Sequence, residues 1–404
     1  MKGDTSMHIK PAQIRAYRLR AHHLDKKIPM TDLLAAAGAC GVQNSPPGAW
    51  ETALFNRLKG CALQGLHDAL YKEKSLLQAW SYRGAPVVFP TAQSDVFLTA
   101  LLAQAGEQPW IYTLGISGAL DFLQMPFDDL LARTKEAAKY LDTHIAQSKE
   151  LLDRALAEIV CSDLPEEKRA LWRAPSMYGH PDRQTVGEAA VSFLLRPCSF
   201  SSLVVFGERR GAKATFTSFQ NWIGHAPVPT ADAQRALARK FFHCYGPANL
   251  EALVGWLGCS RRQGRRLFDA VAEELEPVQV EGKPCYMLRE DLQDLMAFDT
   301  CEQRLILLGA HDPYLDIKDR SVILEDKALQ KAVWKTVGNP GVIVKGGRAV
   351  GIWRQKTLKN RLEISMGLFE ALDAAEQGAL DALAEEYAAF RGLSLVKLER
   401  SDFC

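Results

Sequence analysis

Apolar residues recur every three or four positions through residues 11–58 of the chain. This spacing places them on one side of a helix, and it predicts helices over residues 11–24, 32–40 and 50–58. Thr31 stands where the N-cap of the second helix is expected. The N-terminal part of the chain is therefore expected to be mainly helical.

A short polar stretch, residues 41–48, separates the second and third of these helices. Two prolines and a glycine at 46–48 exclude a continuous helix, so Gln43, Asn44 and Ser45 are expected on an extended connection. Asn and Ser often bond to nearby backbone in turns and helix caps, which is one explanation for polar residues between apolar runs. The other explanation is that the connection displays carboxamides into a functional site.

A recurring order of elements, helices followed by a hairpin, continues along the chain. Apolar and aromatic residues over 75–89, on both sides of Arg83-Gly84, predict the first hairpin. The second group is predicted as helices over 134–160 and 185–195 with a hairpin over 202–217. The third group is predicted as helices over 232–245, 250–257 and 261–275 with a hairpin over 278–288 that turns at Gly282-Lys283. This is the order of a winged helix-turn-helix, and the third group shows it most clearly.

Beyond residue 304 the pattern changes to strands. Residues 342–354 contain β-branched runs around a Gly-Gly turn and predict a hairpin, residues 362–366 predict another strand, and residues 374–390 predict a closing helix. We therefore expect an α+β fold in which three tandem winged-helix domains precede an α/β C-terminal domain. The predicted domains are residues 1–125, which carry the 41–48 connection, then 126–227, 228–297 and 298–404.

The composition is that of an ordinary globular protein, with 47% hydrophobic and 24% charged residues among 404. No apolar run approaches the roughly 18–20 residues needed to cross a membrane, and the first residues lack the apolar core of a signal peptide. Nine cysteines are scattered without a Cys-x-x-Cys pair. This favours reduced thiols in a cytoplasm and argues against a zinc site.

Positive charges gather on several predicted elements, although the formal net charge is only +1. The densest cluster lies in the first turns of the last helix of the third group and comprises Arg261, Arg262, Arg265 and Arg266. A DNA-recognition helix needs such a cationic face. Other candidate DNA contacts, on the predicted hairpins, are Arg83, Arg209, Arg210, Lys213, Lys345 and Arg348. A solvated basic face is the alternative for any one cluster, but their recurrence favours double-stranded DNA as the partner.

The sequence lacks the motifs of several other chemistries. It contains no P-loop, no Gly-x-Gly-x-x-Gly before a helix, no Gly-x-Ser-x-Gly and no His-Glu-x-x-His. ATP, nicotinamide, serine-hydrolase and zinc-protease chemistries therefore have no support. We expect neither a nucleotide cofactor nor a metal.

Short segments in order along the chain resemble the landmarks of a known family. Residues 13–24 resemble its opening helix, residues 41–45 fall where it carries its catalytic motif, and Trp80–Gly84 looks like its Trp-x-x-Arg-Gly hairpin. Further similar segments are residues 245–248 with Trp256, 311–315 with 318–320, and 350–354. This family is the AlkZ/YcaQ-type winged-helix DNA glycosylases. The resemblance implies a β-barrel-like last domain, a C-shaped clamp on damaged duplex DNA, and removal of alkylated purines that include N7-alkylguanine and cross-link-derived lesions.

The resemblance assigns catalysis to the 41–48 connection. An N7-alkylated guanine is a cationic leaving group, so the enzyme need only place a water near the anomeric carbon and stabilise an oxocarbenium-like state. The family motif is Gln, an aliphatic residue, then Gln or Asp. Here Gln43 matches the first position, whereas Asn44 and Ser45 depart from the pattern, and a hydroxyl is a poor base without charge. Asp312 is a candidate substitute carboxylate, although an Asp-Pro pair also starts turns.

Three functions follow as hypotheses. The first is a monofunctional DNA glycosylase. The second is a winged-helix protein that has lost catalysis and senses or shields damage or regulates transcription, and the departures at Asn44 and Ser45 favour it. The third is a protein-interaction scaffold, which requires that the basic elements do not share a surface.

Overall fold

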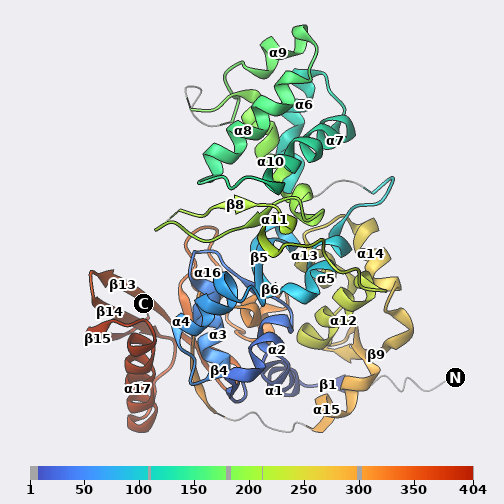
Figure 1. Cartoon of the computed structure of the whole chain (residues 1–404). Coiled ribbons are helices and arrows are strands. Elements are labelled where there is room, and N and C mark those ends of the chain that lie inside the picture. Colours follow the sequence, from blue (N-terminus) through green and yellow to red (C-terminus); the bar gives the residue numbers. More distant parts are fainter. Residues whose placement is uncertain (1–7, 108–110, 179–182, 212, 298–302, 404) are drawn as a thin grey trace, which may run out of the picture. The chain divides into compact units, whose positions relative to one another are not determined.

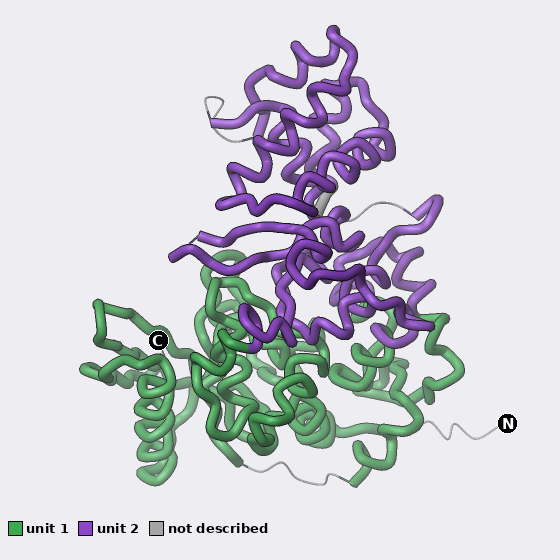
Figure 2. The backbone as a smooth tube through the Cα atoms, viewed as in Figure 1, with its two compact units in different colours: residues 1–68, 238–253, 268–404 green, residues 69–237, 254–267 purple. Residues whose placement is uncertain are grey.

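The structure is a computed structural model that describes residues 8–107, 111–178, 183–211, 213–297 and 303–403. The chain forms two compact units that interleave along the sequence (Figure 2). Unit 1 comprises Met1–Asp68, Ala238–Leu253 and Phe268–Cys404, and unit 2 comprises Ala69–Leu237 and Val254–Leu267. Each unit is described below by itself.

The first part of unit 1 alternates short strands with helices. Its elements are β1 (His8–Ile9), α1 (Pro11–Ala21), β2 (Ile28–Pro29), α2 (Leu33–Gly38), β3 (Val42–Gln43), α3 (Ala49–Arg57), β4 (Leu58–Lys59) and α4 (Leu63–His67). The three helices predicted here are present as α1, α2 and α3. The apolar side of α1, with Ile14, Tyr17 and Ala21, packs into a core that also contains Val278 and Met287.

The third predicted group of elements is present in order along the chain. It consists of α12 (Ala233–Tyr245), α13 (Leu250–Leu257), α14 (Arg261–Asp269), β9 (Leu275–Val280) and β10 (Lys283–Leu288), followed by α15 (Leu292–Ala297). The helix predicted over 261–275 ends earlier, at Asp269, because Leu275 already pairs with Leu288 in the hairpin. The turn lies at Glu281 and Gly282, one residue before the predicted position. Their φ values are 48° and 74°, as a type I′ turn requires.

The C-terminal part of unit 1 is a five-stranded sheet with helices. Its elements are β11 (Leu305–Leu308), α16 (Lys327–Val333), β12 (Gly341–Lys345), β13 (Arg348–Leu358), β14 (Arg361–Leu368), α17 (Ala374–Phe390) and β15 (Ser394–Asp402). The strand order is β11-β12-β13-β14-β15. Neighbouring strands are antiparallel except for β14 and β15, which are parallel. The β12–β13 hairpin turns at Gly346 and Gly347, as predicted, with φ values of 53° and 77°.

This sheet is open, which corrects the expectation of a barrel-like domain. Among the described residues β11 and β15 are the two edges of the sheet rather than paired neighbours. Helix α17 connects the parallel strands β14 and β15 (Figure 1), and it packs against β11 and β15. The sheet is therefore covered by this helix instead of closing on itself.

Unit 2 combines two short hairpins with a helical layer. Its elements are β5 (Leu76–Trp80), β6 (Pro86–Pro90), α5 (Ser94–Phe97), α6 (Ser117–Leu123), α7 (Phe127–Ala138), α8 (Lys149–Ser162), α9 (Glu166–Trp172), α10 (Val186–Phe200), β7 (Val205–Phe206), β8 (Phe216–Thr217) and α11 (Phe219–Ile223). Helix α10 packs against α6, α7, α8 and α9 (Figure 1). The single helical stretch predicted over 134–160 is in fact two helices. The second of them, α8, starts after Ser148, whose hydroxyl caps the helix by accepting a hydrogen bond from the Leu151 N–H at 3.2 Å.

Both predicted hairpins of unit 2 are present. Strands β5 and β6 pair from Leu76–Pro90 to Trp80–Pro86, and β7 pairs with β8. Trp80 stacks on Phe216 with ring centroids 5.2 Å apart, which joins the two hairpins through the core. Within the described ranges, no helix is both long and apolar enough to span a membrane.

Candidate active site

The 41–48 connection lies in unit 1 and begins as the short strand β3. Val42 and Asn44 are buried, with 1% and 6% of their surfaces exposed, whereas Gln43 and Ser45 are half-buried. Successive side chains of an extended segment point to opposite sides. The alternation therefore puts Gln43 and Ser45 on the same, more accessible side.

Asn44 serves the turn that follows. Its Oδ1 accepts a hydrogen bond from the backbone N–H of Gly48 at 2.7 Å. Gly48 has a φ of 93° and directly precedes α3, in a conformation that favours glycine. A buried carboxamide is tolerated when its polar atoms are hydrogen-bonded. This contact explains how a polar side chain occupies the buried position between Gln43 and Ser45.

A carboxylate that the sequence pattern did not single out, Glu51, lies beside the end of the connection. It belongs to the first turn of α3, and its Oε1 accepts a hydrogen bond from Nε2 of His67 at 2.9 Å, while Oε2 pairs with Arg391. Burial raises the pKa of Glu51, but the hydrogen bond from His67 and the charge of Arg391 lower it by more than burial raises it. The pKa of Glu51 is therefore below its ordinary value. The only local signal for this residue is its place in the first helical turn, where acidic residues are favoured.

A recess of about 230 Å³ opens next to the connection. Pro46, Pro47 and Gly48 line one side of it, and Gln355 of β13 and Arg391, the residue after α17, line another. It is smaller than the roughly 300–1,000 Å³ of typical small-molecule sites. The backbone that follows Ser45 is therefore accessible from this side.

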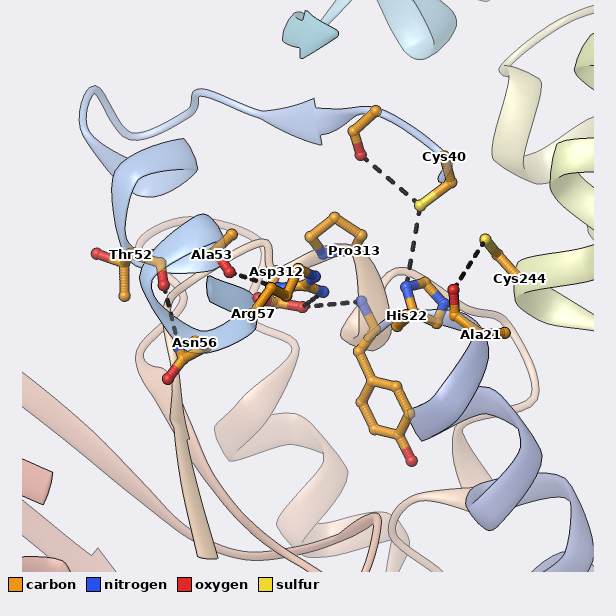
Figure 3. Close-up of polar contacts among 12 residues, drawn as sticks. Ala21, His22, Cys40, Thr52, Ala53, Asn56, Arg57, Cys244, Asp312 and Pro313 are labelled. Atoms are coloured by element: carbon orange, nitrogen blue, oxygen red, sulfur yellow. Dashed lines mark hydrogen bonds and ion pairs between the residues drawn. The ribbon is translucent and has the colours of Figure 1, made fainter. Parts of the chain in front are cut away.

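Beneath the connection, α3 is fixed by a buried ion pair. Arg57 donates to both carboxylate oxygens of Asp312, each at 2.9 Å, and to the carbonyl of Ala53 at 2.7 Å (Figure 3). Asp312 also accepts a hydrogen bond from the Tyr314 N–H at 3.0 Å, as the cap of a short helical turn. Only 1% of its surface is exposed. This geometry favours the turn-starting role for Asp312, since a general base must reach a water.

The start of the connection lies beside a second buried cluster, formed by His22, Cys40 and Cys244 (Figure 3). Their ligand atoms all lie within 4.8 Å of one another, and Nδ1 of His22 is 3.9 Å from Sγ of Cys40. A hydrogen bond with the Cys244 thiol lowers the pKa of Cys40 well below its ordinary value, although burial opposes this shift. The same hydrogen bond, together with burial, raises the pKa of Cys244. No sequence pattern indicates this group, since its members are far apart along the chain.

Arg83 lies in unit 2, in the loop between β5 and β6. Its φ of 56° is unusual for a residue other than glycine. Its Nη1 donates to the carbonyl of Trp256 at 2.9 Å, and the neighbouring Tyr82 stacks on the Trp256 ring at 4.4 Å. Arg83, predicted as a DNA contact, therefore holds the end of α13 against the hairpin loop.

The arginines of α14 differ in their surroundings. Arg262 donates to the carbonyl of Gly106 at 2.9 Å, and Arg266 makes a bidentate ion pair with Glu107 at 2.7 and 2.9 Å. Only 18% of the Arg266 side chain is exposed. Arg261, Arg262 and Arg265 are exposed. The structure thus packs Arg266 within unit 2 and leaves the other three at the surface, where Arg262 is held by the Gly106 carbonyl.

The remaining predicted DNA contacts lie on hairpins. At the tip of β7–β8, Arg210 and Lys213 are exposed and connected by a backbone bridge, while Arg209 is half-buried. At the β12–β13 turn of unit 1, Arg348 pairs with Glu370 at 2.8 Å, and Lys345 pairs with Glu376. These two cations are partly neutralised by carboxylates of their own unit.

Comparison with known proteins gives one consistent result. The model of the DNA glycosylase AlkZ-like family matches residues 36–390. The interstrand DNA cross-link repair glycosylase of Streptomyces sahachiroi is 26% identical over 360 residues, which are 84% of this chain and 86% of that protein. The solved structure of the DNA glycosylase AlkZ from Streptomyces sahachiroi has a TM-score of 0.76 and 21% identity, covers 98% of this chain and 100% of its own, and has the same fold. Because the family match extends over most of the sequence, this protein belongs to the AlkZ-like family of DNA glycosylases.

Proposed function

We propose that this protein hydrolyses the N-glycosidic bond of alkylated purines in duplex DNA, with N7-alkylguanine and bulky or cross-link adducts as substrates. The observation that carries the proposal is the alternation along the 41–48 connection, which gives Gln43 and Ser45 one accessible side. The relative in Streptomyces sahachiroi is named as an interstrand DNA cross-link repair glycosylase, which supports this class of lesion.

In the proposed reaction, Gln43 and Ser45 hold one water against the anomeric carbon. The carboxamide of Gln43 offers a donor and an acceptor, and the Ser45 hydroxyl offers one of each. As the C1′–N9 bond breaks, its electron pair neutralises the positive charge of the N7-alkylated ring and the neutral base departs. The water oxygen then bonds to C1′, and its proton passes to solvent.

The absence of a carboxylate at the third motif position limits which bases can leave. Ser45 orients a water but supplies neither charge nor a strong base. Most of the driving force must then come from the leaving group, which favours cationic N7-alkylpurines over neutral bases. Glu51 is held in its ionised form by His67 and Arg391, and these contacts fix the end of the connection rather than supply a free charge.

DNA binding is proposed to rest on the exposed cations of unit 2: Arg210, Lys213, Arg261 and Arg265. Cations that contact phosphates release counterions and make binding dependent on salt. The order α12, α13, α14, β9, β10 along the chain supports a winged helix over residues 228–297, with α14 as its recognition helix. The division of the remaining chain into two further winged helices is part of the same proposal.

A second candidate function is a DNA-binding protein without catalysis. The specific observation in its favour is Ser45, at the position where the family motif has Gln or Asp. Both functions predict salt-sensitive binding to duplex DNA, so binding alone does not separate them.

Excision separates the two functions. A duplex with a single N7-methylguanine is incubated with the wild type and with Gln43→Ala, and the free base is quantified under single-turnover conditions. We expect release by the wild type and a loss of roughly a hundredfold or more in Gln43→Ala, the range for removal of a positioning group in the transition state. Gln220→Ala, at an exposed glutamine on α11 of unit 2, is the matched control.

Equal release by the wild type and Gln43→Ala would place catalysis elsewhere and contradict the proposal. Binding without release by the wild type, on N7-methylguanine and on a bulky N7 adduct, would establish the binding-only function instead.

A further inference from the structure

The cluster of His22, Cys40 and Cys244 has no role in the proposed reaction. All three side chains are buried, with at most 3% of their surfaces exposed, and neither cysteine belongs to a disulfide among the described residues. In unit 1, His22 directly follows α1, Cys40 directly precedes the 41–48 connection, and Cys244 lies at the end of α12. We infer that these three side chains form a site for one zinc ion, which pins the start of the catalytic connection to the two helices.

The spacing of the ligand atoms fits a contraction onto a single ion. In a tetrahedral zinc site, Zn–S bonds of about 2.3 Å and Zn–N bonds of about 2.0 Å place the ligand atoms roughly 3.5–3.8 Å apart. Nδ1 of His22 and Sγ of Cys40 are 3.9 Å apart, and no pair in the cluster is separated by more than 4.8 Å. Small side-chain movements therefore complete the geometry without rearranging the backbone.

The donor set also matches the chemistry of zinc. Two cysteine sulfurs and one imidazole nitrogen are ligands that zinc prefers, and three protein ligands leave a fourth position for a water. On binding, each thiol releases its proton to solvent, and two thiolates balance the charge of Zn²⁺. The nearby buried cation Arg57 is already matched by Asp312, so it does not oppose a neutral site.

A buried polar atom of the cluster lacks a partner. Nε2 of His22 has no hydrogen-bond partner in the part of the chain that the structure describes, and the rings of Tyr245 and Tyr314 lie edge-on to the imidazole at 5.1 and 5.8 Å. Buried polar atoms are normally satisfied. The ion would bind at Nδ1, the nitrogen 3.9 Å from Sγ of Cys40, so it would hold the imidazole ring without supplying this partner for Nε2.

The position of the cluster gives the ion a structural task. Cys40 directly precedes Gly41, and Gln43 follows two residues later. An ion held by His22 and Cys244 would fix Cys40 from both helices at once, and so fix the starting point of the catalytic strand. The cysteines are scattered along the sequence, which is why their spacing argued against zinc. The fold brings two of them beside a histidine.

The test uses the full-length wild type, purified without a metal-affinity tag under reducing conditions. We expect about one zinc per chain by elemental analysis. After chelation, one equivalent of Co²⁺ should give sulfur-to-cobalt charge-transfer absorption and the visible bands of a four-coordinate ion. Both readouts are independent of DNA excision, so failure of the proposed glycosylase function does not affect them.

Substitutions then assign the ligands. Cys40→Ser, Cys244→Ser and His22→Gln should each lower metal content and weaken the cobalt spectrum, whereas Cys198→Ser should leave both unchanged. Cys198 is equally buried but lies in α10 of unit 2. If a ligand variant fails to fold, the cobalt spectrum of the wild type still shows whether thiolates bind the metal. The inference is overturned if the wild type binds neither ion through thiolate, if it is purified with a Cys40–Cys244 disulfide, or if Cys198→Ser loses the metal as the ligand variants do.

Discussion

Oδ1 of Asn44 accepts a hydrogen bond from the backbone N–H of Gly48 at 2.7 Å, across the loop that joins β3 to α3. Because Asn44 points into the protein, its neighbours Gln43 and Ser45 point the other way. The departure from the family motif at this position is thus a turn contact, and the two residues that can hold a water remain on one side.

Asn44→Ala should leave the Gly48 N–H without its partner inside the protein. The expected cost is about 1–3 kcal/mol in the free energy of unfolding. Asn44→Asp keeps the acceptor and should lose less. Amide hydrogen exchange of residues 41–50 is the direct measurement, and protection there should fall in Asn44→Ala while Asn360→Ala, on an exposed turn, matches the wild type. Unchanged protection in Asn44→Ala would show that the bond does not hold the loop.

The Arg57–Asp312 pair offers a clean separation of stability from catalysis. Asp312→Asn and Arg57→Met each leave a buried charge without its partner, at an expected cost of about 3–5 kcal/mol in stability. The double variant should cost less than the sum of the two. Asp312→Asn should nonetheless excise N7-methylguanine at a near wild-type rate, when assayed below its unfolding temperature. A rate loss of a hundredfold or more in folded Asp312→Asn would instead make Asp312 the catalytic carboxylate.

Glu51 should make the loop sensitive to acid. Its pKa in the folded protein is lower than the ordinary value of 4.5, so its contribution to stability is present above pH 4.5 and is lost as the pH falls through the folded-state pKa. Glu51→Gln removes this dependence, and its unfolding temperature should change less with pH in that acidic range than that of the wild type. Glu167→Gln, at an exposed glutamate of α9, serves as the control. Parallel pH profiles for the wild type and Glu51→Gln would refute the assignment.

The arginines of α14 should differ in what they do. Arg261→Ala with Arg265→Ala should weaken DNA binding and reduce the slope of log K against log salt by about 1.8, which is 0.9 for each phosphate that is no longer neutralised. Arg266→Ala breaks the ion pair with Glu107, so it should lower the unfolding temperature of unit 2 and leave the salt slope nearly unchanged. Titrations at several salt concentrations distinguish the two. If Arg266→Ala alone removes the salt dependence, the division of α14 into packing and binding residues is wrong.

Local signals account for what the sequence predicted well. Asp373 is the N-cap of helix α17. The turn at Gly346 and Gly347 was predicted from the Gly-Gly pair between two β-branched runs. The accessible side shared by Gln43 and Ser45 also follows from alternation along the extended segment that begins as β3. Helix caps, turns and strand alternation depend only on residues that are close together in the sequence, so they can be predicted from a single sequence.

Contacts between distant segments were beyond the sequence. The sequence predicts Arg266 as part of a basic face, whereas in the structure it forms an ion pair with Glu107. The sequence offers Asp312 as a candidate catalytic carboxylate, whereas in the structure it forms a buried ion pair with Arg57. The family resemblance implied a barrel-like last domain, whereas among the described residues β11 and β15 are the two edges of an open sheet. Each of these features depends on which residues from distant parts of the sequence come into contact, and hydrophobic periodicity does not identify those residues.

The most direct test of the central claim is a double-substitution cycle on excision of N7-methylguanine, with Gln43→Ala, Ser45→Ala and the combined variant. If the two side chains hold the same water, their effects are coupled, and the combined variant should be about as slow as the slower single variant. Rate losses that multiply would mean that Gln43 and Ser45 act independently. Wild-type rates in all three variants would contradict the account.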